Sequence, residues 1–298
     1  MGGHHDQIEN HDHSNDSTKN IKVAFFLNLT FTIFEFIGGY YTNSVAIMAD
    51  AVHDLGDSLS LGLSWHLDKK SKQQRDNKFT FGYKRFSLLG ALITGLVLVV
   101  GSGFILIKTI PRLIHPEHAD AQGMFWFAIV GILVNGFSVI KLSGGKTLNE
   151  KMVRWHLIED VIGWVAVFIV SIVLMFYDVP ILDPLLSLVI IAYVLFNVIK
   201  NLKETFLVFL QGVPSDIDYE AIEKKILELA EVKSVHRVHV WSLDGASNVM
   251  TIHVVINDVE TSSEMLFAKR KVREILNDYS IEHSTIEIEL SKEVGREL

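Results

Sequence analysis

Four ionisable residues lie within Ser44–Trp65, an apolar stretch long enough to cross a bilayer as a helix. They are Asp50, His53, Asp54 and Asp57. At about 3.6 residues per helical turn, these positions share one face. Ionisable groups at membrane depth are costly unless they face a partner, a cavity or an ion. His53 and Asp57 are spaced so that they lie one above the other, and they can therefore hold the same ion.

A second apolar stretch, Trp155–Trp164, repeats this arrangement with His156 and Asp160 at the same spacing. Two imidazoles and two carboxylates suit a divalent metal such as zinc, which takes about four nitrogen or oxygen ligands in a tetrahedron. With Zn²⁺ bound, the set is formally neutral, as a low-dielectric bilayer requires. We therefore predict a transport site formed by His53, Asp57, His156 and Asp160.

The same atoms can bind protons when the metal leaves, because imidazole titrates near pH 6.5, about the physiological range. A site of this kind that opens alternately to either side acts as a metal/proton exchanger. Asp50 and Asp54 are expected to support the ligands or to line the entry route. A single His–Asp pair on a soluble helix is usually an ordinary polar contact; two pairs inside apolar helices favour metal.

Composition limits the other possibilities. The chain has 298 residues, 49% of them hydrophobic, and a formal net charge of -8, which argues against nucleic-acid binding. It has no cysteine, so any metal must use nitrogen and oxygen donors. An intramembrane metalloprotease is disfavoured, since there is no His-Glu-x-x-His motif and a fourth protein ligand leaves no open position for water. We do not expect an enzyme.

Three parts are expected along the chain. Residues 1–20 are polar and are predicted to be a disordered tail, whose histidines either collect metal or belong to a solvated terminus or tag: His4, His5, His11 and His13. Residues 21–205 are predicted to form a six-span transmembrane domain, with spans near 21–41, 44–65, 84–107, 123–142, 155–177 and 183–200. The first span is expected to be retained rather than cleaved. Residues 211–298 have the composition of a soluble domain.

Lys and Arg residues set the orientation of the spans. They concentrate in the link between spans two and three, in the link between spans four and five, and after span six. The links 40–44 and 178–182 carry none. Because positive residues stay on the cytoplasmic side, both termini are predicted to be cytoplasmic.

The soluble part alternates between helical and strand patterns. We predict a helix over 215–231, strands over 234–243 and 248–256, a helix over 261–279 and a last strand over 282–290. This order indicates a small α+β sandwich in which two helices cover one sheet. Strict alternation on the first strand places His236, Val238 and Val240 on one face and His239 on the other.

The six spans, the two His-x3-Asp pairs, the FGYKR segment at 81–85 and the VHRVHVWSL segment at 235–243 together resemble the cation diffusion facilitator family. The resemblance covers nearly the whole chain from about residue 20. It implies a homodimer that exports zinc from the cytoplasm in exchange for protons and carries a cytoplasmic, metallochaperone-like (ferredoxin-like) domain. It also implies that a second, cytoplasmic metal site corresponds to His236, His253, Glu287 and Glu289.

The sequence thus predicts a proton-coupled zinc efflux transporter that works by alternating access in the cell membrane. Metal bound between two cytoplasmic domains is expected to draw them together and favour transport. Two alternatives stay open: a family member that exports cadmium, cobalt, iron(II) or manganese, and a membrane metal sensor without transport. Imidazole ligands favour zinc over manganese, which prefers oxygen donors.

Overall fold

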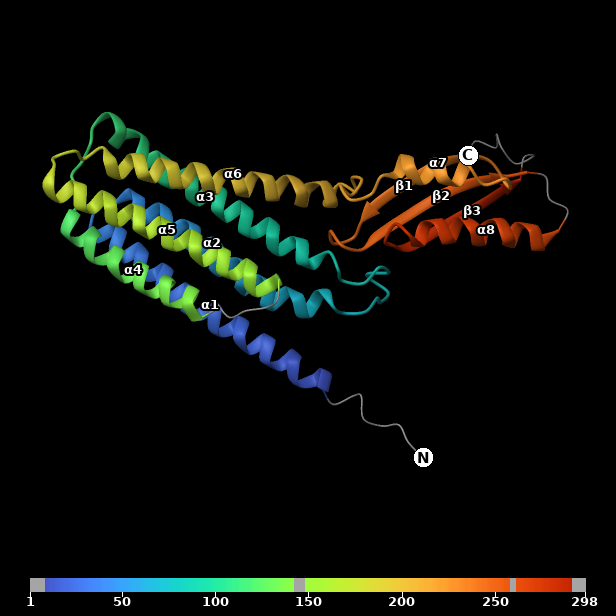
Figure 1. Ribbon diagram of the computed structural model, residues 1–298, viewed down its shortest axis with the longest axis horizontal. Helices are drawn as coiled ribbons and strands as arrows, with labels where there is room; N and C mark the ends of the chain where they lie inside the picture. The colour runs from blue at the N-terminus through green and yellow to red at the C-terminus, as the bar shows by residue number, and fades with distance from the viewer. Residues whose placement is uncertain (1–8, 142–147, 258–260, 291–298) are drawn as a thin grey trace. The chain divides into compact units, whose positions relative to one another are not determined.

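The structure is a computed structural model that describes residues 9–141, 148–257 and 261–290. His4 and His5 of the predicted tail lie outside these residues. The described part contains eight helices and three strands (Figure 1). In chain order they are α1 (Glu9–Tyr41), α2 (Val45–Ser71), α3 (Phe86–Ile114), α4 (Ala121–Lys141), α5 (Leu148–Phe176), α6 (Leu182–Phe209), α7 (Tyr219–Leu227), β1 (Val232–Ser242), β2 (Asn248–Ile256), α8 (Ser262–Asn277) and β3 (Ile281–Leu290).

The chain divides into two compact units. The first combines the residues up to Lys69 with Gly90–Asn201, and it contains most of the six long helices. The second combines Lys70–Leu89 with the residues from Leu202 onward. The loop between α2 and α3 therefore belongs to the same unit as the soluble domain.

All six predicted long helices are present, but several extend beyond their expected ends. α1 begins at Glu9, whereas the first span was predicted to begin near Ile21. Once the apolar part of a helix has formed, each added residue gains a hydrogen bond, and polar residues can continue it at small cost. α3 and α6 likewise run on to Ile114 and Phe209.

Four helices in the described part are long and apolar enough to cross a membrane: Phe86–Ile114, Ala121–Ile140, Arg154–Phe176 and Leu182–Phe209. Large apolar side chains on these helices are exposed, including Val100, Ile107, Phe137, Ile140 and Phe196. Such a surface suits lipid rather than water. α1 and α2 fall short of this measure of length and hydropathy. α2 carries two of the four predicted ligands, His53 and Asp57, together with the acidic residues Asp50 and Asp54.

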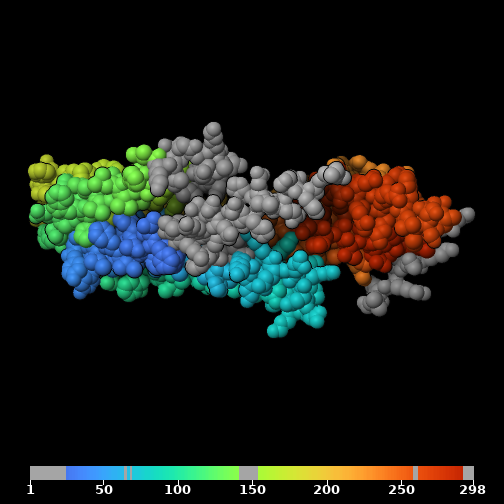
Figure 2. All heavy atoms as spheres, turned by 90° about the horizontal axis from the view of Figure 1, so that it is seen from below, coloured from blue at the N-terminus to red at the C-terminus, as the bar shows by residue number. Residues whose placement is uncertain are grey.

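The core of the helical unit packs α4 along α5 (Figure 1). Trp164 of α5 is fully buried and lies so close to Gly131 of α4 that a methyl group there would be 2.1 Å from Trp164 Cδ2. Phe31 of α1 meets the same indole, with ring centroids 5.9 Å apart. α1 and α4 also lie side by side in both views (Figures 1 and 2). This packing fixes the helix that carries His156 and Asp160.

The soluble domain has the predicted α+β architecture. Its sheet has the order β1-β2-β3, with β1 antiparallel and β3 parallel to β2. Side chains of α7 and α8 pack with alternate residues of β2 in one apolar core, represented by Ile226, Val272 and Ile252. α8 begins as its sequence predicts, because Thr261 caps it by accepting a hydrogen bond from the Glu264 amide.

The face assignment predicted for β1 is wrong. His236 pairs with His253, but His239 pairs with Thr251, so the strand has one extra residue between them, a β-bulge. Arg237 in the bulge has φ of 49°. Because Thr251 and His253 lie on one face of β2, the bulge brings His236 and His239 onto that same face. Val238 and Val240 instead join the core on the other face.

Candidate metal centre

α2 presents His53 and Asp57 one helical turn apart. The His53 Nε2 atom lies 3.8 Å from Asp57 Oδ2, and both side chains are about a quarter exposed, at 22% and 28%. The Asp57 Oδ2 atom itself is buried and, among the described residues, has no hydrogen-bond partner. The spacing seen in the sequence therefore places both donors at one point on the helix surface.

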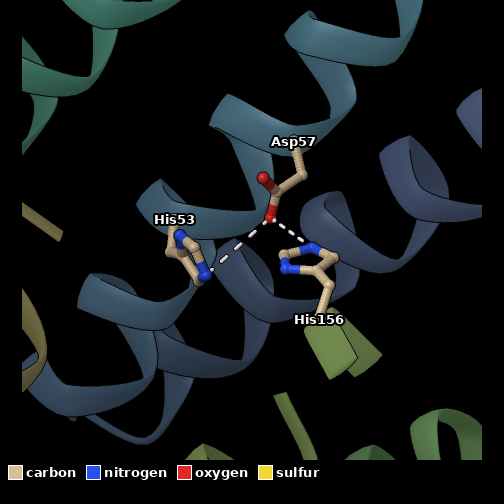
Figure 3. A group of neighbouring side chains, drawn as sticks. All are labelled: His53, Asp57 and His156. Atoms are coloured by element: carbon tan, nitrogen blue, oxygen red, sulfur yellow. Dashed lines mark ion pairs between the residues drawn. The ribbon is translucent and has the colours of Figure 1, made fainter. Parts of the chain in front are cut away.

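His156 of α5 lies next to His53 and Asp57 of α2. Its Nε2 atom lies 3.1 Å from Asp57 Oδ2, and its ring centroid is 5.8 Å from that of His53. Figure 3 shows the Asp57 carboxylate between the two imidazoles. One ligand atom from each of these three residues lies within 4.8 Å of the other two. Donors at these separations surround a space that one cation can occupy after small side-chain adjustments.

Asp160, the fourth predicted ligand, lies beside this group rather than within it. Its Oδ2 atom is 4.0 Å from His156 Nε2. Its Oδ1 atom is buried and, among the described residues, has no hydrogen-bond partner. A buried carboxylate oxygen without a donor is costly, and a bound cation removes that cost. The structure thus brings three predicted ligands together and leaves the fourth adjacent.

Asp50 and Asp54, predicted to support the ligands, are both buried on α2. Asp50 faces α5, since a methyl group at Gly163 would lie 3.5 Å from its Oδ1 atom. Asn28 of α1 donates to the Asp54 backbone oxygen and to Ser58 Oγ, which fixes α1 against the same segment of α2. Neither aspartate belongs to the three-residue group, and their role in entry or support stays a prediction.

Asp183 of α6 holds the N-terminal end of α2, a role that the sequence analysis missed. It accepts hydrogen bonds from Ser44 Oγ at 2.5 Å, from the Val45 amide at 2.8 Å and from the Ala46 amide at 3.3 Å. The carboxylate therefore accepts hydrogen bonds from amides that have no partner within the helix. Its negative charge also interacts favourably with the positive end of the helix dipole. An aspartate in the first turn of an apolar span was the available signal.

A second group of potential metal ligands lies on the sheet of the soluble domain. His253 Nδ1 and Glu289 Oε1 are 2.5 Å apart, and His236 Nε2 lies 3.2 Å from Glu289 Oε2. The hydrogen bond from His253, and then the charge of His236, lower the pKa of the Glu289 carboxyl. The three residues come from three different strands: His236 from β1, His253 from β2 and Glu289 from β3. Their ligand atoms lie within 4.8 Å of one another.

Glu287, the other predicted cytoplasmic ligand, does not join this group. It is exposed, although it is the register partner of His253. Glu289 pairs with Val255 and reaches diagonally to His253 instead. His239 shares the face through the bulge, but it is exposed and also lies outside the group.

Comparison with known proteins supports both parts of the chain. Residues 21–210 match the family model "Cation efflux transmembrane domain", and residues 214–291 match "Cation efflux protein, cytoplasmic domain". Among solved structures, the "Metal-bound C-terminal domain of the CzcD transporter" from Cuprividus metallidurans aligns with 25% of this chain and 100% of its own, at 34% identity and a TM-score of 0.22.

Full-length relatives are also similar. A "Cadmium, cobalt and zinc/H(+)-K(+) antiporter" of Bacillus velezensis is 34% identical over 94% of this chain and 91% of its own length. The "Metal cation efflux system protein CzcD" of Cupriavidus metallidurans is 34% identical over 98% and 91%. A "Zinc transporter ZitB" of Pectobacterium atrosepticum is 30% identical over 95% and 89%. The chain is thus an integral membrane protein that belongs to the cation efflux family, the cation diffusion facilitators, whose members are metal-cation transporters.

Proposed function

We propose that this protein exports Zn²⁺ in exchange for protons, with His53, Asp57, His156 and Asp160 as the transported ion's ligands. The observation that carries the proposal is the convergence of His53, Asp57 and His156 from two helices on one point. Their nitrogen and oxygen donors suit zinc, and relatives with "zinc" in their names support this cargo.

Exchange follows from the chemistry of the ligands. A histidine must be neutral and an aspartate ionised to bind zinc, so each bound metal displaces protons from the group. When the metal leaves, the same atoms take up protons, which restores charge balance at a depth where net charge is costly. Alternating access of this one site then couples outward metal movement to inward proton movement.

The test is ⁶⁵Zn uptake into sealed, inside-out vesicles that contain the purified protein. We expect uptake to rise when the vesicle interior is made more acidic than the outside, and to disappear in Asp57→Ala. Asp178→Asn, at an exposed aspartate outside the site, is the matched control and should transport normally. Zinc binding without any flux would instead support a sensor, and preferred uptake of Cd²⁺, Co²⁺, Fe²⁺ or Mn²⁺ in competition would change the cargo.

The remaining functional proposals concern the rest of the chain. The protein acts as a homodimer in the cell membrane with both termini in the cytoplasm, as the distribution of Lys and Arg supports. Cytoplasmic zinc binds His236, His253 and Glu289 and favours transport by drawing two soluble domains together. If His236→Ala/His253→Ala leaves the zinc dependence of transport unchanged, this regulatory role is excluded.

A further inference from the structure

The loop between α2 and α3 has a defined conformation of its own. Asp76 accepts hydrogen bonds from the Lys78 and Phe79 amides, each at 2.8 Å, and from the Tyr83 hydroxyl at 2.7 Å. These bonds, led by that from Tyr83, lower the pKa of the Asp76 carboxyl. Gly82 adopts φ of 78°, which a residue with a side chain rarely adopts. The chain therefore leaves this turn in a fixed direction at Lys84.

Lys84 binds the end of the sheet with its whole ammonium group. Its Nζ atom lies 2.7 and 2.9 Å from the two carboxylate oxygens of Glu282 and 2.8 Å from Ser247 Oγ. An ammonium group has three N–H donors, and these three acceptors account for all of them. The interaction lowers the pKa of the Glu282 carboxyl, with the Lys84 hydrogen bond as its main cause.

The two acceptors, Ser247 and Glu282, lie at the same end of the sheet. Ser247 ends the turn between β1 and β2, where Asp244 accepts its amide hydrogen bond at 2.7 Å. Glu282 lies near the start of β3, and the first residues of β2 and β3 are register partners. Beside them, the Phe81 and His283 rings have centroids 6.1 Å apart. Figure 1 shows the loop beside this end of the sheet.

The loop held by Lys84 connects α2, which carries two of the proposed metal ligands, to α3. α2, which carries His53 and Asp57, ends at Ser71, and α3 begins at Phe86, directly after the FGYKR segment. We propose that Lys84 is a positioning residue for cation transport: by binding Glu282 and Ser247 it clamps the α2–α3 loop to the soluble domain, and this clamp stays closed throughout transport. Lys84 then acts through the loop and touches no transported ion.

Charge variants test the clamp through initial ⁶⁵Zn uptake in inside-out vesicles. We expect Lys84→Gln and Glu282→Gln each to lower the maximal rate about two- to fivefold, the range expected for losing a partly exposed ion pair. The double variant should be no slower than either single one. Lys84→Arg and the charge exchange Lys84→Glu/Glu282→Lys should restore the rate. Lys78→Gln removes a charge from the same loop and should change nothing.

A second experiment separates the clamp from a general effect on folding. The natural chain has no cysteine, so Lys84→Cys/Glu282→Cys provides a single thiol pair that a short, reducible bifunctional methanethiosulfonate reagent can join. We expect slow transport before joining, restored transport after it and slow transport again after reduction, with the zinc concentration for half-maximal rate unchanged. If transport stays slow after the two cysteines are joined, or if Lys84→Gln transports at the wild-type rate, the proposed clamp is refuted. Absence of zinc uptake by the wild-type protein would instead refute the proposed zinc export.

Discussion

Asp57→Asn is the most informative substitution, because it removes one charge while it preserves the shape of the side chain. Asp57 Oδ2 is the atom that both imidazoles approach, at 3.8 Å from His53 and 3.1 Å from His156. Two unit charges about 4 Å apart interact by roughly 4 kcal/mol at an effective dielectric constant near 20, and the double charge of Zn²⁺ makes this a lower bound for the loss of the Asp57 charge. Since about 1.4 kcal/mol corresponds to a factor of ten, we expect zinc affinity to fall on the order of a thousandfold.

The assay is the zinc dependence of initial ⁶⁵Zn uptake in inside-out vesicles, with Asp178→Asn as a control for the loss of one carboxylate. The concentration for half-maximal uptake should rise beyond the measurable range in Asp57→Asn and stay unchanged in the control. Half-maximal uptake within twofold of the wild-type value would show that Asp57 does not bind the transported ion, and the assignment of the whole group would be wrong.

Three further predictions concern packing, capping and pH. Gly131→Ala places a methyl group 2.1 Å from the buried Trp164 ring, and we expect a loss of about 1–3 kcal/mol, seen as a lower thermal unfolding temperature in detergent; an unchanged temperature would contradict the close α4–α5 packing. Asp183→Ala leaves the Val45 and Ala46 amides without their acceptor and should cost about 1–3 kcal/mol, measurable in the same way, whereas Asp178→Ala should not. The pKa of the Glu289 carboxyl is lower in the folded protein than in the unfolded chain. The ionised carboxylate therefore stabilises the fold fully above the unfolded-state pKa of about 4.3, and this stabilisation is lost as pH falls through the lower folded-state pKa. Urea unfolding at several pH values should show this loss in the wild type and a smaller one in His253→Gln; equal pH dependence in both would refute it.

The sequence was sufficient to predict the elements that carry the proposed metal ligands. Imidazole and carboxylate groups four residues apart in apolar stretches have few uses other than binding an ion, and regular helical geometry then fixes which atoms face together. His53, Asp57 and His156 do converge. That Asp160 lies adjacent rather than within the group depends on how α5 is rotated against α2, which side-chain packing decides and local pattern does not.

Other features depend on contacts between distant parts of the chain. Alternation along β1 was misleading because a single extra residue at Arg237 moves His236 and His239 onto one face. Nothing in the VHRVHV segment marks that residue as a bulge, since Arg is neither small nor a frequent left-handed residue. Likewise, Asp183 and Lys84 gain their roles from partners far along the chain. The aspartate in the first turn of α6 and the FGYKR segment are visible in the sequence, but neither identifies those partners.

The central claim is that α2 and α5 each contribute an imidazole to one transported cation. X-ray absorption at the zinc K-edge measures this directly in the zinc-loaded protein, using a variant without residues 1–20 and with His236→Ala/His253→Ala, so that only the membrane site can bind. We predict a shell of about four nitrogen and oxygen atoms near 2.0–2.1 Å that contains two imidazoles and loses one of them in His156→Ala. A shell with a single imidazole, or one that His156→Ala leaves unchanged, would contradict the account.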